Sequence, residues 1–184
     1  MGQFIQRDAD FADDLVAFWD GDAPSDGDQA SVEMGDRLLI FDEDGLVAAF
    51  DAGRHALKSY GEVDVVFVSQ KRHSLENDGE LVEEELETGY VLRATVQVRD
   101  AAKMVELIAM VIEQEQTVED WLADEIAIDA ATAADDVGVD LADLEDERDS
   151  VIPKAIVRAN EVLADHGIEL LSIEELEYGD FEDD

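Results

Sequence analysis

The spacing of the apolar residues in this 184-residue chain changes close to Asp100. Before that point, short apolar runs are separated by turn-forming residues, which is typical of β-strands. After it, apolar residues recur at intervals of three and four, which is typical of amphipathic helices. We therefore predict an α+β fold: a mostly antiparallel N-terminal β lobe, then three helices and a closing C-terminal strand.

Several strands are predicted in the first hundred residues. The clearest two, 37–41 and 46–50, are joined through Asp44-Gly45, a pair that supplies the positive backbone dihedrals of a tight hairpin. A polar stretch extends from 70 to 79, and the segment 20–29 is predicted to be a loop because it is rich in aspartate, glycine and proline. Further strands are predicted at 56–60, 63–69 and 90–99.

Three helices are predicted in the second half. The first covers 101–113, and the second begins at Thr117, whose hydroxyl can cap the backbone three residues on, and runs to about 136. The third covers 141–165, but Pro153 lies inside it and costs about 3 kcal/mol there, so the helix either kinks or starts anew near Ser150. The predicted parts of the chain are an N-terminal extension and loop (1–35), an α+β domain (36–178) with a β lobe (36–99) and a helical lobe with its closing strand (100–178), and an acidic tail (179–184).

The charge of the chain predicts its solvent. Fifty Asp and Glu residues face twelve Lys and Arg residues, which gives a formal net charge of -38. The screening length is about 8 Å at physiological salt and about 3 Å at 1 M, so the self-repulsion of a compact acidic body is relieved in brine. The 46% of hydrophobic residues lie in patterned blocks, which argues against disorder. Acidity with so little lysine resembles the proteins of haloarchaea that accumulate potassium chloride, and it predicts a soluble, halophilic, cytoplasmic protein.

Composition also excludes several classes of function. The chain has no cysteine, which rules out disulfides, thiolate metal sites and a cysteine nucleophile. No apolar run approaches the ~20 residues needed to cross a bilayer, so we expect only indirect or peripheral contact with a membrane. The excess of negative charge argues against nucleic acid as a direct partner.

No catalytic, cofactor-binding or metal-binding residues are predicted. Paired carboxylates are inevitable among fifty acids, and the three histidines lack the spacing of a zinc site. The segment 22–33 partly resembles a calcium loop, but Pro24 occupies a ligand position. The sequence contains no nucleophile elbow, phosphate-binding loop or dinucleotide fingerprint.

Lys71, Arg72 and His73 form a candidate contact site. They include the only two adjacent Lys or Arg residues of the chain. In so acidic a molecule, this basic segment can accept an acidic face of a neighbouring copy and give head-to-tail assembly. The alternative is local pairing with Glu76 or Glu80.

Several segments, taken in order, resemble one known family. They are Asp36 to Phe41, Gly45 to Phe50, Ala52-Gly53-Arg54-His55-Ala56-Leu57, Val65 to Val68 with Gln70-Lys71-Arg72, Gly89 to Arg93 with Arg99-Asp100-Ala101, and Leu163 to Leu170. Together they resemble the stomatin-prohibitin-flotillin (SPFH, or band 7) family, and most closely its virion-core-like subgroup without a membrane span. Ala52 and Ala101 stand where that family commonly has proline.

The resemblance implies a scaffold and no catalytic residues or cofactor. SPFH domains pack beside their own copies, often in rings on a membrane face, and organise other molecules there. We expect neither the usual membrane anchor before the domain nor a long coiled coil after it, so that domain contacts or recruitment by another protein hold it in place. The implied function is a non-enzymatic, self-associating scaffold or adaptor, a homo-oligomer whose protein partner is unknown.

Two other functions remain open on the sequence. A hydrolase or small-ligand enzyme could use ordinary Asp and Glu residues on the same α+β frame. Alternatively, an acidic decoy could mimic nucleic acid and occupy a basic partner.

The charge leads to a first prediction. Circular dichroism during a KCl titration should show loss of structure as the salt falls below about 1 M, because carboxylate repulsion is then no longer screened. Unchanged structure in dilute buffer would contradict the halophilic interpretation.

Overall fold

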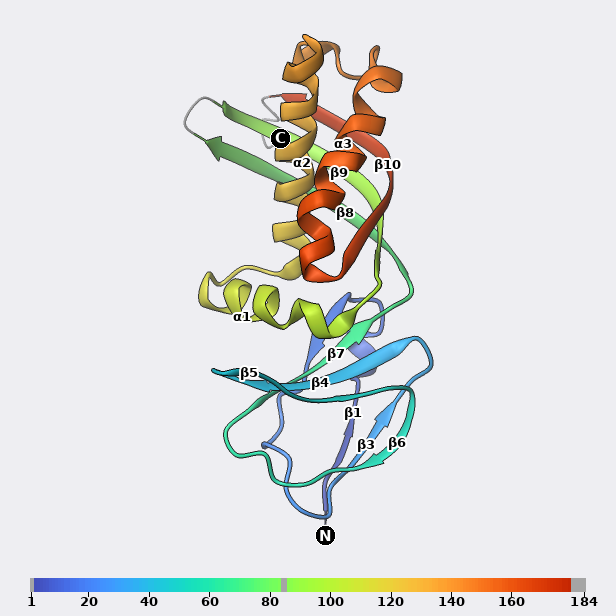
Figure 1. Cartoon of the computed structure of the whole chain (residues 1–184), viewed down its shortest axis with the longest axis vertical. Helices are drawn as coiled ribbons and strands as arrows, with labels where there is room; N and C mark the ends of the chain where they lie inside the picture. The colour runs from blue at the N-terminus through green and yellow to red at the C-terminus, as the bar shows by residue number, and fades with distance from the viewer. Residues whose placement is uncertain (1, 84–85, 180–184) are drawn as a thin grey trace.

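A computed structural model describes residues 2–83 and 86–179, which form two lobes stacked along the long axis of the molecule (Figure 1). The N-terminal lobe contains two small β-sheets. The C-terminal lobe contains a third sheet, against which α2 (Val118–Val137) and α3 (Arg148–Leu163) pack, and α1 (Val105–Glu113) crosses between the lobes. The fold is α+β with a closing C-terminal strand, as predicted.

The two N-terminal sheets have the strand orders β1-β3-β6 and β2-β7-β4-β5. Only β1 and β3 pair in parallel, and the other pairings between the described strands are antiparallel. The strands are β1 (Phe4–Gln6), β2 (Val16–Phe18), β3 (Gln29–Val32), β4 (Asp36–Asp42), β5 (Gly45–Phe50), β6 (Gly53–Ala56) and β7 (Asp64–Ser69).

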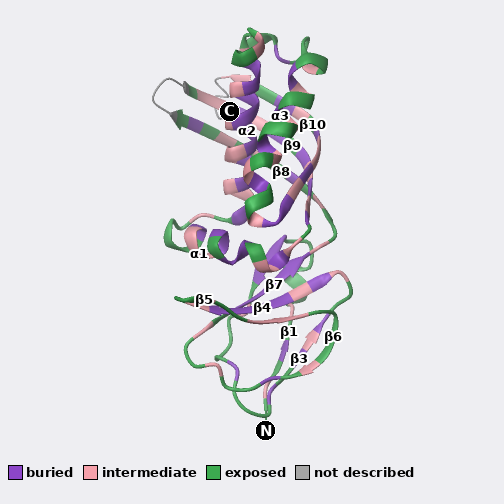
Figure 2. Ribbon diagram, viewed as in Figure 1, coloured by how far each residue is buried: buried purple, intermediate pink, exposed green. Residues whose placement is uncertain are grey.

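The central strands β4 and β7 of the sheet β2-β7-β4-β5 are buried on both faces. In β4, Leu38 and Ile40 join the core beneath sheet β1-β3-β6, whereas Leu39 and Phe41 join the larger core that includes the helices. Because successive side chains of a strand point to opposite faces, a strand covered on both sides has a continuous apolar sequence. Figure 2 shows β4 and β7 as largely buried ribbons at the junction of the lobes.

The third sheet has the order β10-β9-β8, with β8 (Arg72–Glu83), β9 (Leu86–Val98) and β10 (Ile168–Gly179). Its inner face packs against α2 and α3, and small side chains let these helices approach each other closely. Fully buried alanines include Ala127 and Ala130 on α2 and Ala155 and Ala159 on α3. The short 3₁₀ turns are η1 (Ala9–Phe11), η2 (Ala101–Met104), η3 (Leu141–Asp143) and η4 (Ala164–His166).

The predictions based on turn, capping and proline signals in the sequence are confirmed. The predicted hairpin is β4–β5, with Gly45 at a φ of 118°. The Thr117 side chain caps α2 by accepting a hydrogen bond from the Asp120 backbone N–H. In return, the Asp120 carboxylate accepts from the Thr117 backbone N–H. The third helix begins at Arg148, close to the alternative start that Pro153 suggested.

The structure corrects four of the predictions about elements and boundaries. The polar stretch 70–79 mostly belongs to β8, because alternate residues there face the helices. The stretch 1–35 contributes β1, β2 and β3 to the sheets rather than only an extension and a loop. The strand predicted at 56–60 is wrong, because β6 covers Gly53–Ala56 and residues 57–60 are not in a strand. Since β8 and β9 carry the helices, the lobes divide near residue 70 and not at 99/100. Of the predicted acidic tail, 180–184 lie outside the described residues.

Gly167 joins η4 to β10 in a tight turn. Its φ is 73°, and its carbonyl oxygen accepts from the backbone N–H groups of Arg99 (2.7 Å) and Asp100 (3.1 Å). A Cβ at this position would lie 2.0 Å from the Asp100 carbonyl oxygen. Gly138, which ends α2, has a similar φ of 75°, but a Cβ added to Gly138 would have no atom within 4 Å.

This pair gives a second prediction. Gly138→Ala should cost about 1–2 kcal/mol of unfolding free energy, because alanine disfavours the left-handed region. Gly167→Ala should cost about 1–3 kcal/mol more, because the backbone must also move away from the new methyl group. Denaturant unfolding in concentrated KCl measures both, and equal losses would contradict the close approach at Asp100.

Candidate functional site

The basic segment Lys71-Arg72-His73 does not form a single patch. Arg72 is exposed on the outer face of the third sheet, opposite Gln97, whereas His73 is half-buried and lies opposite Val96 on the inner face. Lys71 precedes the strand, and its aliphatic chain lies against Gly35. The alternation of a β-strand therefore separates the three side chains.

Local pairing of this segment is not found among the described residues. None of their ion pairs involves Lys71 or Arg72. Four residues of β-strand span about 13 Å, so Arg72 and Glu76 share a face of β8 but are too far apart to meet. The Arg72 guanidinium is thus available at the start of the strand.

The outer face of the third sheet is polar and mostly acidic. Arg93 on β9 pairs with Glu175 on β10 at 3.2 Å, and Arg99 pairs with Glu169. Pairs as exposed as these contribute little to stability. The remaining carboxylates on the outer side of β8 are Glu76, Asp78 and Glu80, all exposed.

The β10 edge of this sheet is closed by side chains of α3. Asn160 accepts from the Leu170 backbone N–H at 2.7 Å and donates to its carbonyl oxygen at 3.0 Å, as a neighbouring strand would do. Arg148 donates to the carbonyl oxygens of Ile173 (3.1 Å) and Glu174 (3.2 Å). These contacts occupy backbone groups that another strand would need.

The β8 edge is open by comparison. Across the part of the chain that the structure describes, the outward backbone groups of β8 make no hydrogen bond, and the strand is twelve residues long. An edge of this length is a template for a further strand, and the charges of Glu76, Asp78 and Glu80 oppose such pairing. Screening by salt weakens that opposition.

Two buried polar groups hold the C-terminal lobe together. The Tyr90 hydroxyl donates to Asp124 on α2 at 2.7 Å, and burial raises the pKa of Tyr90 above its ordinary value. Asp129 lies 3.2 Å from Arg158 across the two long helices, and burial raises the pKa of this carboxyl. Neither group had a signal in the sequence, because each depends on a partner brought near by folding.

The segment that resembled a calcium loop has a structural role. Asp28 accepts from the backbone N–H groups of Ser25 and Gln3, both at 2.7 Å, and the bond from Ser25 is the main cause that lowers the pKa of Asp28. Within 2–83 and 86–179 there is no group of three or more His, Asp or Glu residues placed to hold a metal ion. The helices in these ranges are all too short or too polar to cross a membrane.

The closed edge gives a third prediction. Asn160→Ala should cost about 1–3 kcal/mol of unfolding free energy, because the partly buried N–H and C=O of Leu170 lose their partners. Asn77→Ala is the control, since the side chain of Asn77 bonds to other side chains, Asp120 at 3.4 Å and Tyr90, and not to strand backbone, and its loss should cost less than about 1 kcal/mol. Denaturant unfolding in concentrated KCl compares them, and a loss for Asn160→Ala no larger than the control would contradict the closure of β10.

Comparison with known proteins finds no family model that matches this chain. No curated protein matches it either. The candidate edge therefore rests on the geometry of this chain.

Proposed function

We propose that this chain is a non-enzymatic, self-associating scaffold or adaptor of SPFH type, which works in a high-salt cytoplasm and can organise partners at a membrane face. The observation that carries the proposal is the difference between the two edges of the third sheet. Asn160 and Arg148 occupy the β10 edge, whereas twelve residues of β8 are open to another strand.

Two copies can pair through β8 about a two-fold axis. Antiparallel pairing of β8 with itself would extend the three-stranded sheet across both copies. In the register that places Glu76 opposite its own copy, Arg72 of each copy lies opposite Glu80 of the other. Arg72 has no ion pair with the described residues of its own chain. In the dimer, the Arg72 of each copy would gain an ion pair with Glu80 of the other copy.

This arrangement revises the head-to-tail assembly suggested by the sequence. Head-to-tail growth of the sheet would require the β10 edge, which is occupied. Pairing through β8 also reduces the predicted contact site, Lys71, Arg72 and His73, to Arg72 alone, because His73 faces the inner side of the sheet. The repulsion between the two Glu76 side chains and between the two acidic bodies makes the dimer dependent on salt.

The hydrolase alternative has less support from the described residues. The carboxyl with a raised pKa is Asp129, whose nearest charged partner is Arg158 and not a second carboxylate poised for acid-base work. The decoy alternative is weakened because Arg93 and Arg99 interrupt the carboxylates on the outer sheet face.

The proposal gives a fourth prediction. Size-exclusion chromatography with light scattering in ~3 M KCl, where the screening length is below about 3 Å, should show a dimer at high micromolar concentration. Arg72→Glu should weaken this dimer about tenfold, because two attractive contacts become repulsive. Arg54→Glu is the matched control: Arg54 is also exposed and makes no ion pair with the residues that the structure describes, but it lies on β6 in the other lobe.

A strict monomer under these conditions would contradict self-association itself. A dimer that Arg72→Glu leaves intact would show that another surface mediates it.

A further inference from the structure

A hollow of about 620 Å³ lies beside β2, between the turn η1 and the connection from α1 to α2. Three large apolar side chains that are unusually exposed line it: Phe11 (47%), Phe18 (45%) and Ile112 (44%). Trp19 and Val118 add further apolar surface. A hollow with exposed aromatic and aliphatic walls is the kind of surface that binds another molecule.

Backbone groups at the rim of this hollow point outward. β2 is an edge strand of the sheet β2-β7-β4-β5. Leu15 accepts from Ser69 and Trp19 donates to Val65, both at 2.9 Å, so residues 15 and 19 face β7. In an antiparallel ladder the intervening residues of opposite parity, Val16 and Phe18, then present their N–H and C=O groups to the open side.

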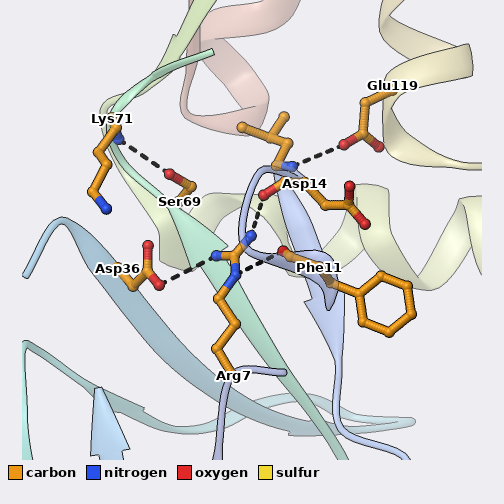
Figure 3. A network of polar contacts seen from close by, with 8 residues as sticks. Arg7, Phe11, Asp14, Asp36, Ser69, Lys71 and Glu119 are labelled. Carbon is orange, nitrogen blue, oxygen red and sulfur yellow. Dashed lines mark hydrogen bonds and ion pairs between the residues drawn. The ribbon is translucent and has the colours of Figure 1, made fainter. Parts of the chain in front are cut away.

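The walls of the hollow are held in place by buried polar contacts, shown in Figure 3. The Arg7 guanidinium donates to the carbonyl oxygens of Phe11 (3.0 Å) and Asp14 and pairs with Asp36 at 3.3 Å. The side chains of Arg7 and Asp36 are each only 4% exposed. On the opposite wall, Glu119 accepts from the Leu15 N–H at 2.9 Å. Such a preformed site loses little freedom when it binds a ligand.

The charges around the hollow select the ligand. Its lining contains no lysine or arginine, and His73 is its one basic residue. The carboxylates on it are Asp8, Asp14, Asp20 and Glu119. An apolar floor with an acidic rim complements a segment that is apolar at its centre and cationic at its ends.

We propose that this groove binds an extended segment of a partner protein, which pairs with β2, places apolar side chains on Phe18 and Ile112, and directs flanking lysines or arginines to the acidic rim. The outward groups of Val16 and Phe18 supply the pairing, as in other cases of strand addition. A second copy is a poor occupant because the chain is strongly acidic and its longest open edge, β8, carries Glu76, Asp78 and Glu80. His73 of β8 is part of the groove lining, but Arg72, Glu76 and Glu80 are not, so the proposal rests on different residues from those proposed for self-association.

Synthetic peptides test the proposal with the full-length chain. The probe is a short fluorescent peptide in which valine and threonine alternate between lysine-rich ends, titrated in ~1 M KCl, where long-range attraction is screened. Its control peptides are a scrambled sequence, a version with glutamate-rich ends, and an analogue with N-methylated nitrogens along both strand edges. We expect fluorescence anisotropy to show binding of the probe and at least about tenfold weaker binding of each control.

Variants of the protein locate the binding. Phe18→Ser combined with Ile112→Ser should weaken probe binding at least about tenfold, because it removes the apolar contacts. Val157→Ser is the matched control, since Val157 is 64% exposed on α3, outside the groove lining. Asp14→Asn with Asp20→Asn should weaken binding, whereas Asp146→Asn with Asp165→Asn, which makes the same charge change elsewhere, should not.

Hydrogen exchange supplies a readout that does not depend on any variant. The probe should slow exchange of the Val16 and Phe18 amides in the unmodified protein. Retained binding of the N-methylated analogue would overturn strand pairing in favour of a simple apolar ligand site. Equal binding of the scrambled or acidic peptide would overturn the proposed partner chemistry, and loss of the dimer in the Phe18 and Ile112 variant would assign the groove to a second copy.

Discussion

The burial of β4 and β7, the central strands of the sheet β2-β7-β4-β5, on both faces is the constraint on which the rest of the molecule depends. Leu38, Ile40 and Phe67 close the core beneath the small N-terminal sheet, and Leu39 and Phe41 enter the core shared with α1 and the C-terminal lobe. A strand covered on both sides cannot slip by one residue without exchanging its two apolar faces. The sheet therefore fixes the register of the N-terminal lobe and gives the helices a firm surface to pack on.

Features with a local cause could be predicted from the sequence. The β4–β5 hairpin follows from its Asp-Gly turn, and the start of α2 follows from Thr117 and Asp120. The strand predicted at 90–99 likewise overlaps β9. Each of these depends on residues within a few positions of one another, so no knowledge of the tertiary structure is needed.

Features with a distant cause could not be predicted. The inner face of β8 includes Asn77 and Gly79, which do not look like core residues. Gly79 leaves room for the ring of Tyr90, since a Cβ at residue 79 would lie 2.7 Å from that ring. The groove has walls from four separated segments: residues 8–20, His73, residues 111–112 and residues 116–119. The side chains of Lys71, Arg72 and His73 could be assigned to faces of the sheet only after β8 had been located. No spacing of residues in the sequence indicates these contacts between distant segments.

The closure of β10 by Asn160 has a consequence in the concentrated salt that we propose as the solvent of this chain. Many proteins guard their sheet edges with charge, but a charged guard loses its reach as the ions around it become more numerous. Hydrogen bonds from a neutral amide act only at contact and are not attenuated in this way. One edge is closed by hydrogen bonds made at contact, from Asn160 and Arg148, and the other is protected by the charges of Glu76, Asp78 and Glu80. Ionic strength would then control pairing at the β8 edge alone, so that high salt would permit a dimer but not the unlimited growth of the sheet.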